Sequence, residues 1–171
     1  MKNLKKILIA LAVIALVVSS LVLIVSAEGE YTGDIKKLYD NYQKVVNAPS
    51  TAGKATTLAE AYTYLSAYPV DPSATHQAVV GSGDSAETIT VTYAEIVAQM
   101  NASSVEVGEM LYSEAAAANT ADKRLTAVQA LLDHIAACTP TETTTGHAEL
   151  VAKANVQNAL VVAEQFELAK A

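Results

Sequence analysis

The stretch "STAGKATTLAEAYTYLSAY", residues 50–68, decides the fold. Its apolar residues recur at the three- and four-residue spacing of one helix face, and Thr51 is placed to cap the helix. The positions on that face are Leu58, Ala61, Tyr62, Leu65 and Tyr68. "PVDP" ends the pattern because proline does not continue a helix. Another amphipathic stretch lies between Gly33 and Ala48, so the short connection "NAPST" predicts an antiparallel helical hairpin over residues 34–70.

The chain then repeats this pattern. "NTADKRLTAVQALLDHIAA", residues 119–137, matches the first stretch at an offset of 69, and "HAELVAKAN", residues 147–155, matches "YAEIVAQMN", residues 93–101, at an offset of 54. We interpret the matches as internal repetition, with related hairpin units near 34–70 and 92–138 and a partial unit at 146–171. Leu65 and Leu131 are expected to be equivalent core positions. The alternative is that alanine-rich amphipathic helices resemble one another by composition alone.

The remaining segments complete an all-α fold class. Residues 77–91, "QAVVGSGDSAETITV", place β-branched runs around a Gly, Ser and Asp cluster, which is typical of a small β-hairpin or an ordered loop. Thr92 and Glu95 have capping-box spacing and begin a long helix. A fourth helix ends near Ala137, and a fifth begins near His147. We expect a hairpin repeat array or a bundle of about five helices.

The first 27 residues indicate where the protein acts. Three lysines precede an uncharged run over residues 7–27, long enough to cross a bilayer, and their charge favours a cytoplasmic N-terminus. "VSA" before Glu28 also suits cleavage of a secretory signal peptide. Residues 1–27 are therefore predicted to be a signal peptide or an N-terminal transmembrane anchor. In both cases residues 28–171 form an exported helical domain, either secreted or anchored to the membrane by residues 7–27.

The charge of the exported part excludes one class of partner. Residues 1–27 hold three lysines and no acidic residue, which leaves eight basic and 18 acidic residues and a net charge of −10 for the remainder. Nucleic acid is not expected as a partner, since nonspecific affinity for it comes from lysine and arginine on phosphates. The same acidity argues against binding flat on an anionic membrane.

No catalytic, cofactor-binding or metal site is predicted. Cys138 is the only cysteine and lies on an apolar helix stripe, which favours a buried, inert thiol. His134 and Cys138 are four residues apart and could begin a zinc site with Asp133 and His147, but structural zinc sites usually show four ligands in paired spacings.

Other combinations of polar residues are better explained by structure than by catalysis. "GSGDSAE", with Ser82, Asp84 and Ser85, lacks the nucleophile elbow of a serine hydrolase, and Asp84 and Glu87 lack the spacing of a calcium loop. Four glutamates are expected on the solvated face of the third helix. They are Glu95, Glu106, Glu109 and Glu114.

Tyrosines are concentrated in the first hairpin. Tyr62 and Tyr68 belong to the core stripe by spacing, with Tyr39 and Tyr42 on the facing helix. Tyr64 falls off that stripe and is expected on a surface, where tyrosine provides contact area at low entropic cost.

These features favour a non-catalytic exported binding or scaffolding module whose helical surface engages a protein or peptide partner. A sensory or structural ectodomain of a larger membrane assembly is one alternative, and a helical hydrolase or metal enzyme with a scattered site is another. The last helix has a broad apolar band that includes Val161 and Phe166. We therefore expect the array to be open at that helix, to continue or to be covered by a partner, with homo-oligomerisation through this helix as one form of cover.

Overall fold

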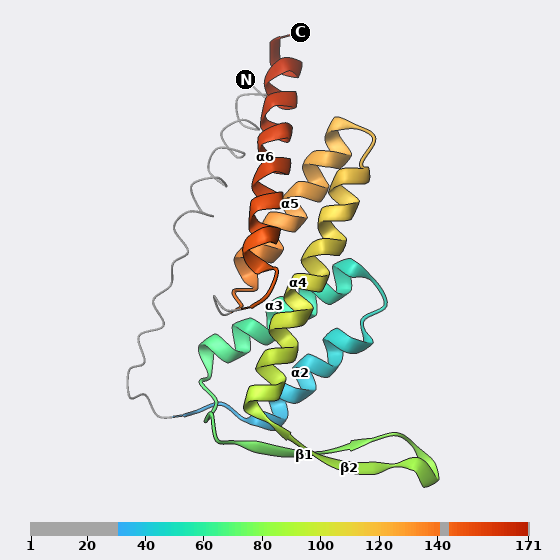
Figure 1. Cartoon of the computed structure of the whole chain (residues 1–171), viewed down its shortest axis with the longest axis vertical. Coiled ribbons are helices and arrows are strands. Elements are labelled where there is room, and N and C mark those ends of the chain that lie inside the picture. The colour runs from blue at the N-terminus through green and yellow to red at the C-terminus, as the bar shows by residue number, and fades with distance from the viewer. Residues whose placement is uncertain (1–30, 141–143, 171) are drawn as a thin grey trace. The chain divides into compact units, whose positions relative to one another are not determined.

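The computed structural model describes residues 31–140 and 144–170 (Figure 1). Over those residues it contains five α-helices, a two-stranded antiparallel sheet and a short 3₁₀ turn. In chain order the elements are α2 (Ile35–Asn47), α3 (Thr51–Ala67), β1 (Thr75–Val80), η1 (Gly83–Ser85), β2 (Glu87–Thr92), α4 (Tyr93–Ala117), α5 (Ala121–Ala137) and α6 (His147–Lys170). The prediction of a mainly helical chain of about five helices is confirmed, and the segment near 77–91 is a β-hairpin.

The predicted signal peptide or transmembrane anchor, residues 1–27, lies outside the described residues. Of the helices in residues 31–140 and 144–170, none has the length and apolar character needed to cross a bilayer. The exported location of the domain therefore stays a prediction.

The chain divides into two compact units, with the boundary inside α4. The described part of the first unit is residues 31–103, and that of the second is residues 104–140 and 144–170. α4 contributes residues 93–103 to the first unit and 104–117 to the second. Each unit therefore combines a helical hairpin with a further helical segment.

In the first unit, α2 and α3 form the predicted hairpin. The carboxylate of Asp34 caps α2 by accepting from the Lys36 amide at 2.8 Å, and the hydroxyl of Ser50 caps α3 by accepting from the Gly53 amide at 3.1 Å. The cap of α3 is thus Ser50, whereas the sequence had favoured Thr51. Leu38 and Leu58 are fully buried in this hairpin.

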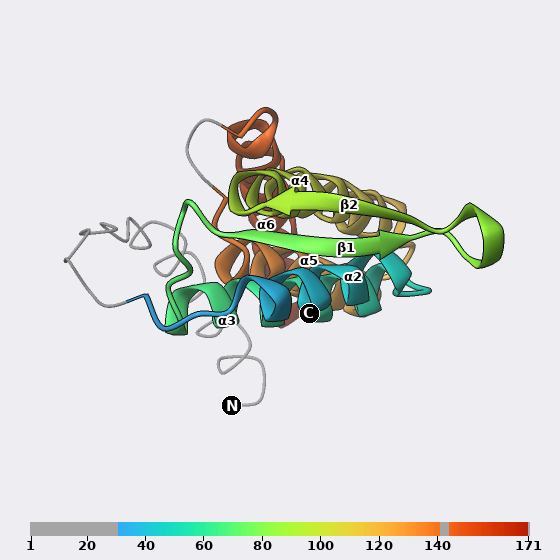
Figure 2. The ribbon, with the colours of Figure 1, turned by 90° about the horizontal axis from the view of Figure 1, so that it is seen from below.

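The β-hairpin belongs to the same unit and lies beside α2. Its strands pair Ala78 with Ile89 and His76 with Val91, and Ala78 and Val91 are buried while the His76 ring lies 5.2 Å from that of Tyr39 on α2. The turn at its end projects past α2 in both ribbon views (Figures 1 and 2). Gly81 has φ +84°, and a Cβ there would lie 2.5 Å from the Ser85 carbonyl oxygen. The turn therefore requires glycine at this position.

The predicted capping box at the start of α4 is confirmed. The Glu95 carboxylate accepts from the Thr92 amide at 2.8 Å, and the Thr92 hydroxyl accepts from the Glu95 amide at 3.2 Å. Two donors at the helix N-terminus are thereby satisfied reciprocally. The Thr92 amide and the Thr92 hydroxyl both donate to the Glu95 carboxylate, and these two bonds hold the pKa of the Glu95 carboxyl below its ordinary value.

In the second unit, α5 is capped by the Thr120 hydroxyl, which accepts from the Lys123 amide at 3.3 Å. α6 runs along α5, and Arg124 joins them by an ion pair to Glu164 at 2.8 Å. Gly108 on α4 permits a close approach to Leu150 on α6, because a Cβ at Gly108 would lie 2.2 Å from a Leu150 methyl carbon. Leu131 is fully buried in this unit.

The two hairpins have the same local construction at an offset of 70 residues. Ser50 and Thr120 cap α3 and α5, which are each 17 residues long, and Tyr68 and Cys138 end them. Five buried positions of α5 correspond one for one to positions of α3, and the partner is buried at four of them. The pairs are Leu58 with Val128, Ala61 with Leu131, Tyr62 with Leu132, Tyr64 with His134 and, with partial burial in α3, Leu65 with Ile135.

This register corrects the expected equivalence of Leu65 and Leu131. The sequence match at 69 placed Thr51 opposite Thr120, but Thr51 is the first residue of α3 and Thr120 precedes α5. Leu131 is 0% exposed and its counterpart is Ala61, while Leu65 is only partly buried. The error of one residue arose because identical capping residue types were aligned instead of equivalent capping positions.

The start of α6 corresponds to the start of α4 at the predicted offset of 54. Ile96 and Leu150 are fully buried, and each follows its helix start by three residues. Met100 and Ala154 are buried one turn later. Each hairpin is therefore combined with a helical segment of the same burial pattern.

Candidate functional site

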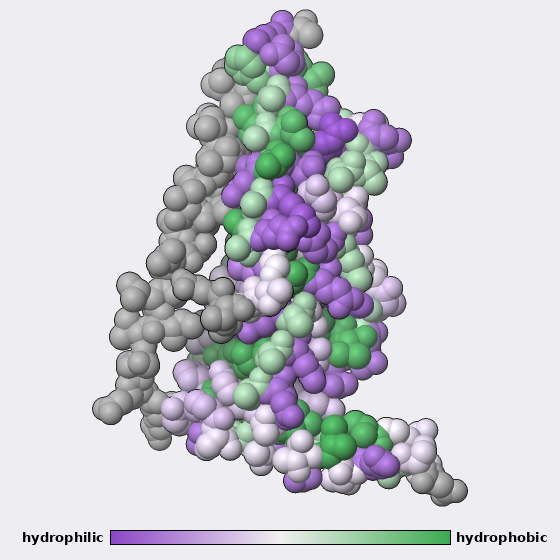
Figure 3. Space-filling model, viewed as in Figure 1, coloured by the Kyte–Doolittle hydropathy of each residue, from purple (hydrophilic) through white to green (hydrophobic). Residues whose placement is uncertain are grey.

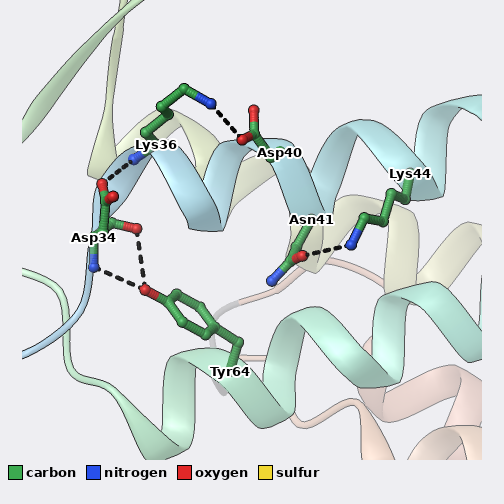
Figure 4. A network of polar contacts seen from close by, with 6 residues as sticks. All are labelled: Asp34, Lys36, Asp40, Asn41, Lys44 and Tyr64. Atoms are coloured by element: carbon green, nitrogen blue, oxygen red, sulfur yellow. Dashed lines mark hydrogen bonds and ion pairs between the residues drawn. The ribbon is translucent and has the colours of Figure 1, made fainter.

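Tyr64 and Tyr68 exchange the places that the helical spacing predicts for them. Tyr64 was expected on a surface but is 9% exposed, and Tyr68 was expected in the core but is 49% exposed. Tyr68 is the C-cap of α3, with φ −132° and ψ 86°, so its side chain leaves the helical stripe. Tyr64 points instead toward the start of α2 (Figure 4).

Tyr64 is fixed by two hydrogen bonds to one residue. Its hydroxyl accepts from the Asp34 amide at 2.8 Å and donates to the Asp34 carbonyl oxygen at 3.3 Å (Figure 4). Asp34 is itself held as the cap of α2. The bonds join the C-terminal end of α3 to the N-terminal end of α2, so the ring of Tyr64 is a rigid support for whatever packs on it.

Lys37 and Tyr68 pack on this support. The Lys37 ammonium lies 5.1 Å from the centroid of the Tyr64 ring and 5.9 Å from that of Tyr68, within the range of cation–π attraction. The two tyrosine rings are 5.3 Å apart at a tilt of 33°. We call Lys37, Tyr64 and Tyr68 the tyrosine–lysine surface.

The groups of this surface are suited to binding a partner. It presents the exposed ring of Tyr68 and the ammonium group of Lys37 in fixed positions. The hydroxyl of Tyr64 is already hydrogen-bonded to Asp34. Neighbouring Lys36 pairs with Asp40 at 2.6 Å, and Lys44 donates to Asn41 at 3.0 Å (Figure 4). Lys37 is the cation directed at the rings. An apolar group of a partner could pack on the Tyr68 ring, and a carboxylate of a partner could pair with Lys37.

The equivalent positions of the second hairpin hold His134 and Cys138, which are buried. His134 is 4% exposed and its Nε2 lies 2.8 Å from the Ser104 carbonyl oxygen. Because a carbonyl only accepts, Nε2 carries the proton and Nδ1 is the acceptor. The Cys138 thiol lies 3.6 Å from Nδ1 and donates to it. Both ring nitrogens of His134 therefore have hydrogen-bond partners within the protein.

The electrostatics of this pair oppose a catalytic role. Burial raises the pKa of the Cys138 thiol to about 12, so the thiolate nucleophile is not formed near neutral pH. Burial also lowers the pKa of His134, the bond to Ser104 opposes that shift, and the charge of His147 adds to it. The prediction that Cys138 is buried is confirmed.

The four residues considered for zinc do not form a ligand set. His147 is near enough to affect the pKa of His134 through its charge, and its own pKa is lowered by burial. Asp133 is on the exposed side of α5, where it accepts from Gln129 at 2.7 Å. Within residues 31–140 and 144–170, no group of three or more His, Cys, Asp or Glu side chains is arranged to hold a metal ion.

Three of the other polar candidates have structural partners. Glu109 pairs with Lys153 of α6 at 3.0 Å, and Glu95 belongs to the capping box. The Ser85 hydroxyl donates to the Ser82 carbonyl oxygen at 2.9 Å within the turn. These groups maintain local structure.

Sequence reasoning had not identified Lys37 as part of a site. The helical periodicity places it one residue before buried Leu38, where a lysine is ordinarily only a solvated side chain. Its cation–π contacts depend on Tyr64 and Tyr68, which are about 30 residues further along. The signal that could have found it is the antiparallel hairpin, which brings the start of α2 to the end of α3.

No protein-family model matches this chain, and neither the curated proteins nor the solved structures contain a match to it.

Proposed function

We propose that this chain is a non-catalytic binding module of an exported protein, and that the tyrosine–lysine surface engages a protein or peptide partner. The observation that carries the proposal is the exposed ring of Tyr68 packed beside Lys37 on the fixed ring of Tyr64. Tyrosine is enriched at protein interfaces because it provides a large contact area with few rotatable bonds. The apolar run and three lysines in residues 1–27 support export, with the domain secreted or anchored.

The fixed geometry favours binding because little conformational freedom remains to be lost when a partner binds. Tyr64 is already held at Asp34, and Lys37 already lies beside both rings. Preorganised side chains retain more of the interaction energy as affinity. The charge of Lys37 favours a partner segment that combines a carboxylate with an apolar side chain.

Site-directed photocrosslinking in the native host tests this proposal. A photoreactive amino acid replaces Tyr68 in one variant and Thr63, an exposed residue on another side of α3, in the control. We expect a specific protein adduct at position 68 and none at position 63. The adduct is identified by mass spectrometry, and the partner is purified for titration calorimetry.

The titration compares Tyr68→Ala with Tyr31→Ala, which removes an exposed tyrosine outside the surface. Tyr68→Ala should weaken binding by about ten-fold or more, as expected for an aromatic hot spot, and Tyr31→Ala by much less. Equal adducts at positions 63 and 68, or unchanged affinity after Tyr68→Ala, would contradict the proposal.

A further inference from the structure

One face of α6 is apolar and exposed. Val156, Leu160 and Phe166 are 60%, 54% and 52% exposed, although large apolar side chains are usually covered. Exposed alanines complete the face at positions 152, 159 and 163. Residues 152, 156, 159, 163 and 166 follow one another at spacings of four and three, which is the seam of a helix that pairs with another helix. Figure 3 shows hydrophobic groups gathered along the upper part of α6.

This face differs from the one that α6 already buries. Leu150, Ala154 and Val161 are at most 1% exposed, and they lie on the other side of the helix by the 3.6-residue turn. α6 thus has two apolar faces. A helix packed on one side only needs a single apolar stripe, so the exposed face is available for a second helix.

The sizes of the side chains on the exposed face are complementary to themselves in an antiparallel pairing. When two α6 helices cross at the midpoint between Ala159 and Leu160, Val156 of one faces Ala163 of the other, and Leu160 faces Ala159. Phe166 then lies opposite Ala152 to within one residue. A large side chain faces a small one at each level, as close helix packing requires.

The charges beside the seam select the same direction. Glu149 and Lys153 lie at the start of α6 and are paired with each other at 3.0 Å, and Glu167 and Lys170 lie at its end and are paired at 2.9 Å. An antiparallel pairing about the same midpoint brings Lys153 beside Glu167 and Glu149 beside Lys170 of the second copy. A parallel pairing would bring like charges together. Antiparallel helix dipoles add to the preference.

We propose that α6 is a homodimerisation surface on which two copies of this chain pair antiparallel, centred on Ala159 and Leu160. The pairing covers Val156, Leu160 and Phe166 on both copies and forms a two-fold symmetric interface. It is independent of the tyrosine–lysine surface, which lies in the other unit, so a dimer would carry two copies of that surface.

Cysteine crosslinking of the full chain in cells tests both the contact and its direction. Single substitutions Leu160→Cys and Phe166→Cys are exposed to a mild oxidant, with the unsubstituted chain and its buried Cys138 as the control. Leu160→Cys should give a covalent dimer because its two copies lie beside the midpoint, only one residue apart along the axis, about 1.5 Å. Phe166→Cys should not, since its two copies are separated by 13 residues along the axis, about 20 Å. Coexpressed Val156→Cys and Ala163→Cys chains should form a mixed dimer.

Three outcomes would overturn the proposal. Dimers from both Leu160→Cys and Phe166→Cys would mean a parallel contact. A Leu160→Cys adduct with a different protein would mean that this protein, and not a second copy of the chain, covers the exposed face of α6. Absence of any Leu160→Cys dimer would mean that a second copy does not bind there.

Leu160→Glu provides a second test that does not depend on oxidation. The residue is half exposed, so the fold should be retained with an unchanged unfolding midpoint. Two carboxylates brought together at the midpoint of the covered interface should abolish the mixed dimer of Val156→Cys and Ala163→Cys. Leu168→Glu, at a similarly exposed residue off the seam, is the matched control and should leave the mixed dimer unchanged. Loss of the dimer in both variants, or in neither, would contradict the assignment.

Discussion

Two hairpins can be compared, one formed by α2 and α3 and the other by residues 104–117 and α5. Each has a side chain near the end of its second helix that hydrogen-bonds to the first helix, but the residue four positions later differs in exposure. In the first, Tyr64 joins Asp34 and leaves Tyr68 exposed beside Lys37. In the second, His134 joins the Ser104 carbonyl and Cys138 is fully buried. Both polar links span 30 residues. The first connects the end of α3 with the N-cap of α2, and the second connects the end of α5 with Ser104 inside α4, where the second unit begins.

The difference shows which part of the hairpin is structural and which part is free to vary. The caps and the buried positions of α3 and α5 correspond, so they define the hairpin. The residue four positions after the hydrogen-bonding side chain, Tyr68 or Cys138, is not determined by the caps or by the buried positions. It is an exposed tyrosine in one hairpin and a buried thiol in the other, and for this reason the binding surface is proposed in the first unit only.

The largest expected effect separates the register of 70 from the register of 69. Leu131→Ala removes a fully buried side chain and should lower the free energy of unfolding by about 2–5 kcal/mol. Leu65→Ala should have a clearly smaller effect because Leu65 is partly exposed. Urea unfolding followed by circular dichroism measures both. Equal losses would restore the equivalence of Leu65 and Leu131.

The second prediction concerns a place where the two hairpins differ in size. Leu38 in α2 corresponds to Gly108 in α4, and a Cβ at Gly108 would lie 2.2 Å from Leu150. Gly108→Ala should destabilise the chain by about 1–3 kcal/mol through overpacking, despite the better helix propensity of alanine.

A double-mutant cycle provides the control. Gly108→Ala combined with Leu150→Val should be less destabilised than the sum of the two single changes, because the shorter side chain makes room for the added methyl group. If Gly108→Ala alone stabilises the chain, α4 and α6 do not approach as closely as Leu150 indicates.

The features of the fold that depend on residues close in sequence could be predicted. Helix spacing and capping residues predicted the five helices of residues 31–140 and 144–170, the hairpin at 34–70 and the capping box of Thr92 and Glu95. The spacing failed at Tyr68 because a C-cap residue leaves the helical dihedral angles, after which periodicity no longer predicts the direction of its side chain.

The tyrosine–lysine surface could not be predicted for a related reason. Tyr64 is directed inward by its hydrogen bonds to Asp34, and Lys37 differs from an ordinary solvated lysine because its ammonium lies over the rings of Tyr64 and Tyr68. These contacts join residues about 30 positions apart, whereas periodicity describes neighbours within a few turns.

A third, smaller effect tests the polar link of the first hairpin. Tyr64→Phe keeps the aromatic ring under Lys37 but removes both hydrogen bonds to Asp34, which should cost about 1 kcal/mol of unfolding free energy. Tyr68→Phe is the matched control, since its ring is half exposed, and should cost much less. Thermal unfolding of the three chains measures the difference. Equal stabilities would mean that Tyr64 is held by packing alone.

The smallest expected effect is a pH dependence of the second hairpin. Burial lowers the pKa of His134 below its ordinary value of 6.5, so the unfolded chain binds a proton at a pH where the folded chain does not. The stability from the neutral ring is complete above about pH 6.5 and is lost as the pH falls toward the lower pKa of the folded state. His147 acts in the same direction because burial lowers its pKa too.

Glu95 and Asp71, whose pKa values are also lowered, lose their contributions only below their ordinary values of 4.5 and 3.8. The interval between pH 5 and 6.5 is therefore the window for the histidines. Urea unfolding at several pH values should show a decline in this window that is reduced in His134→Gln and reduced further when His147→Asn is added. A decline of the same size in all three chains would assign it to other groups, and a gain in stability on acidification would reverse the sign that follows from the buried His134.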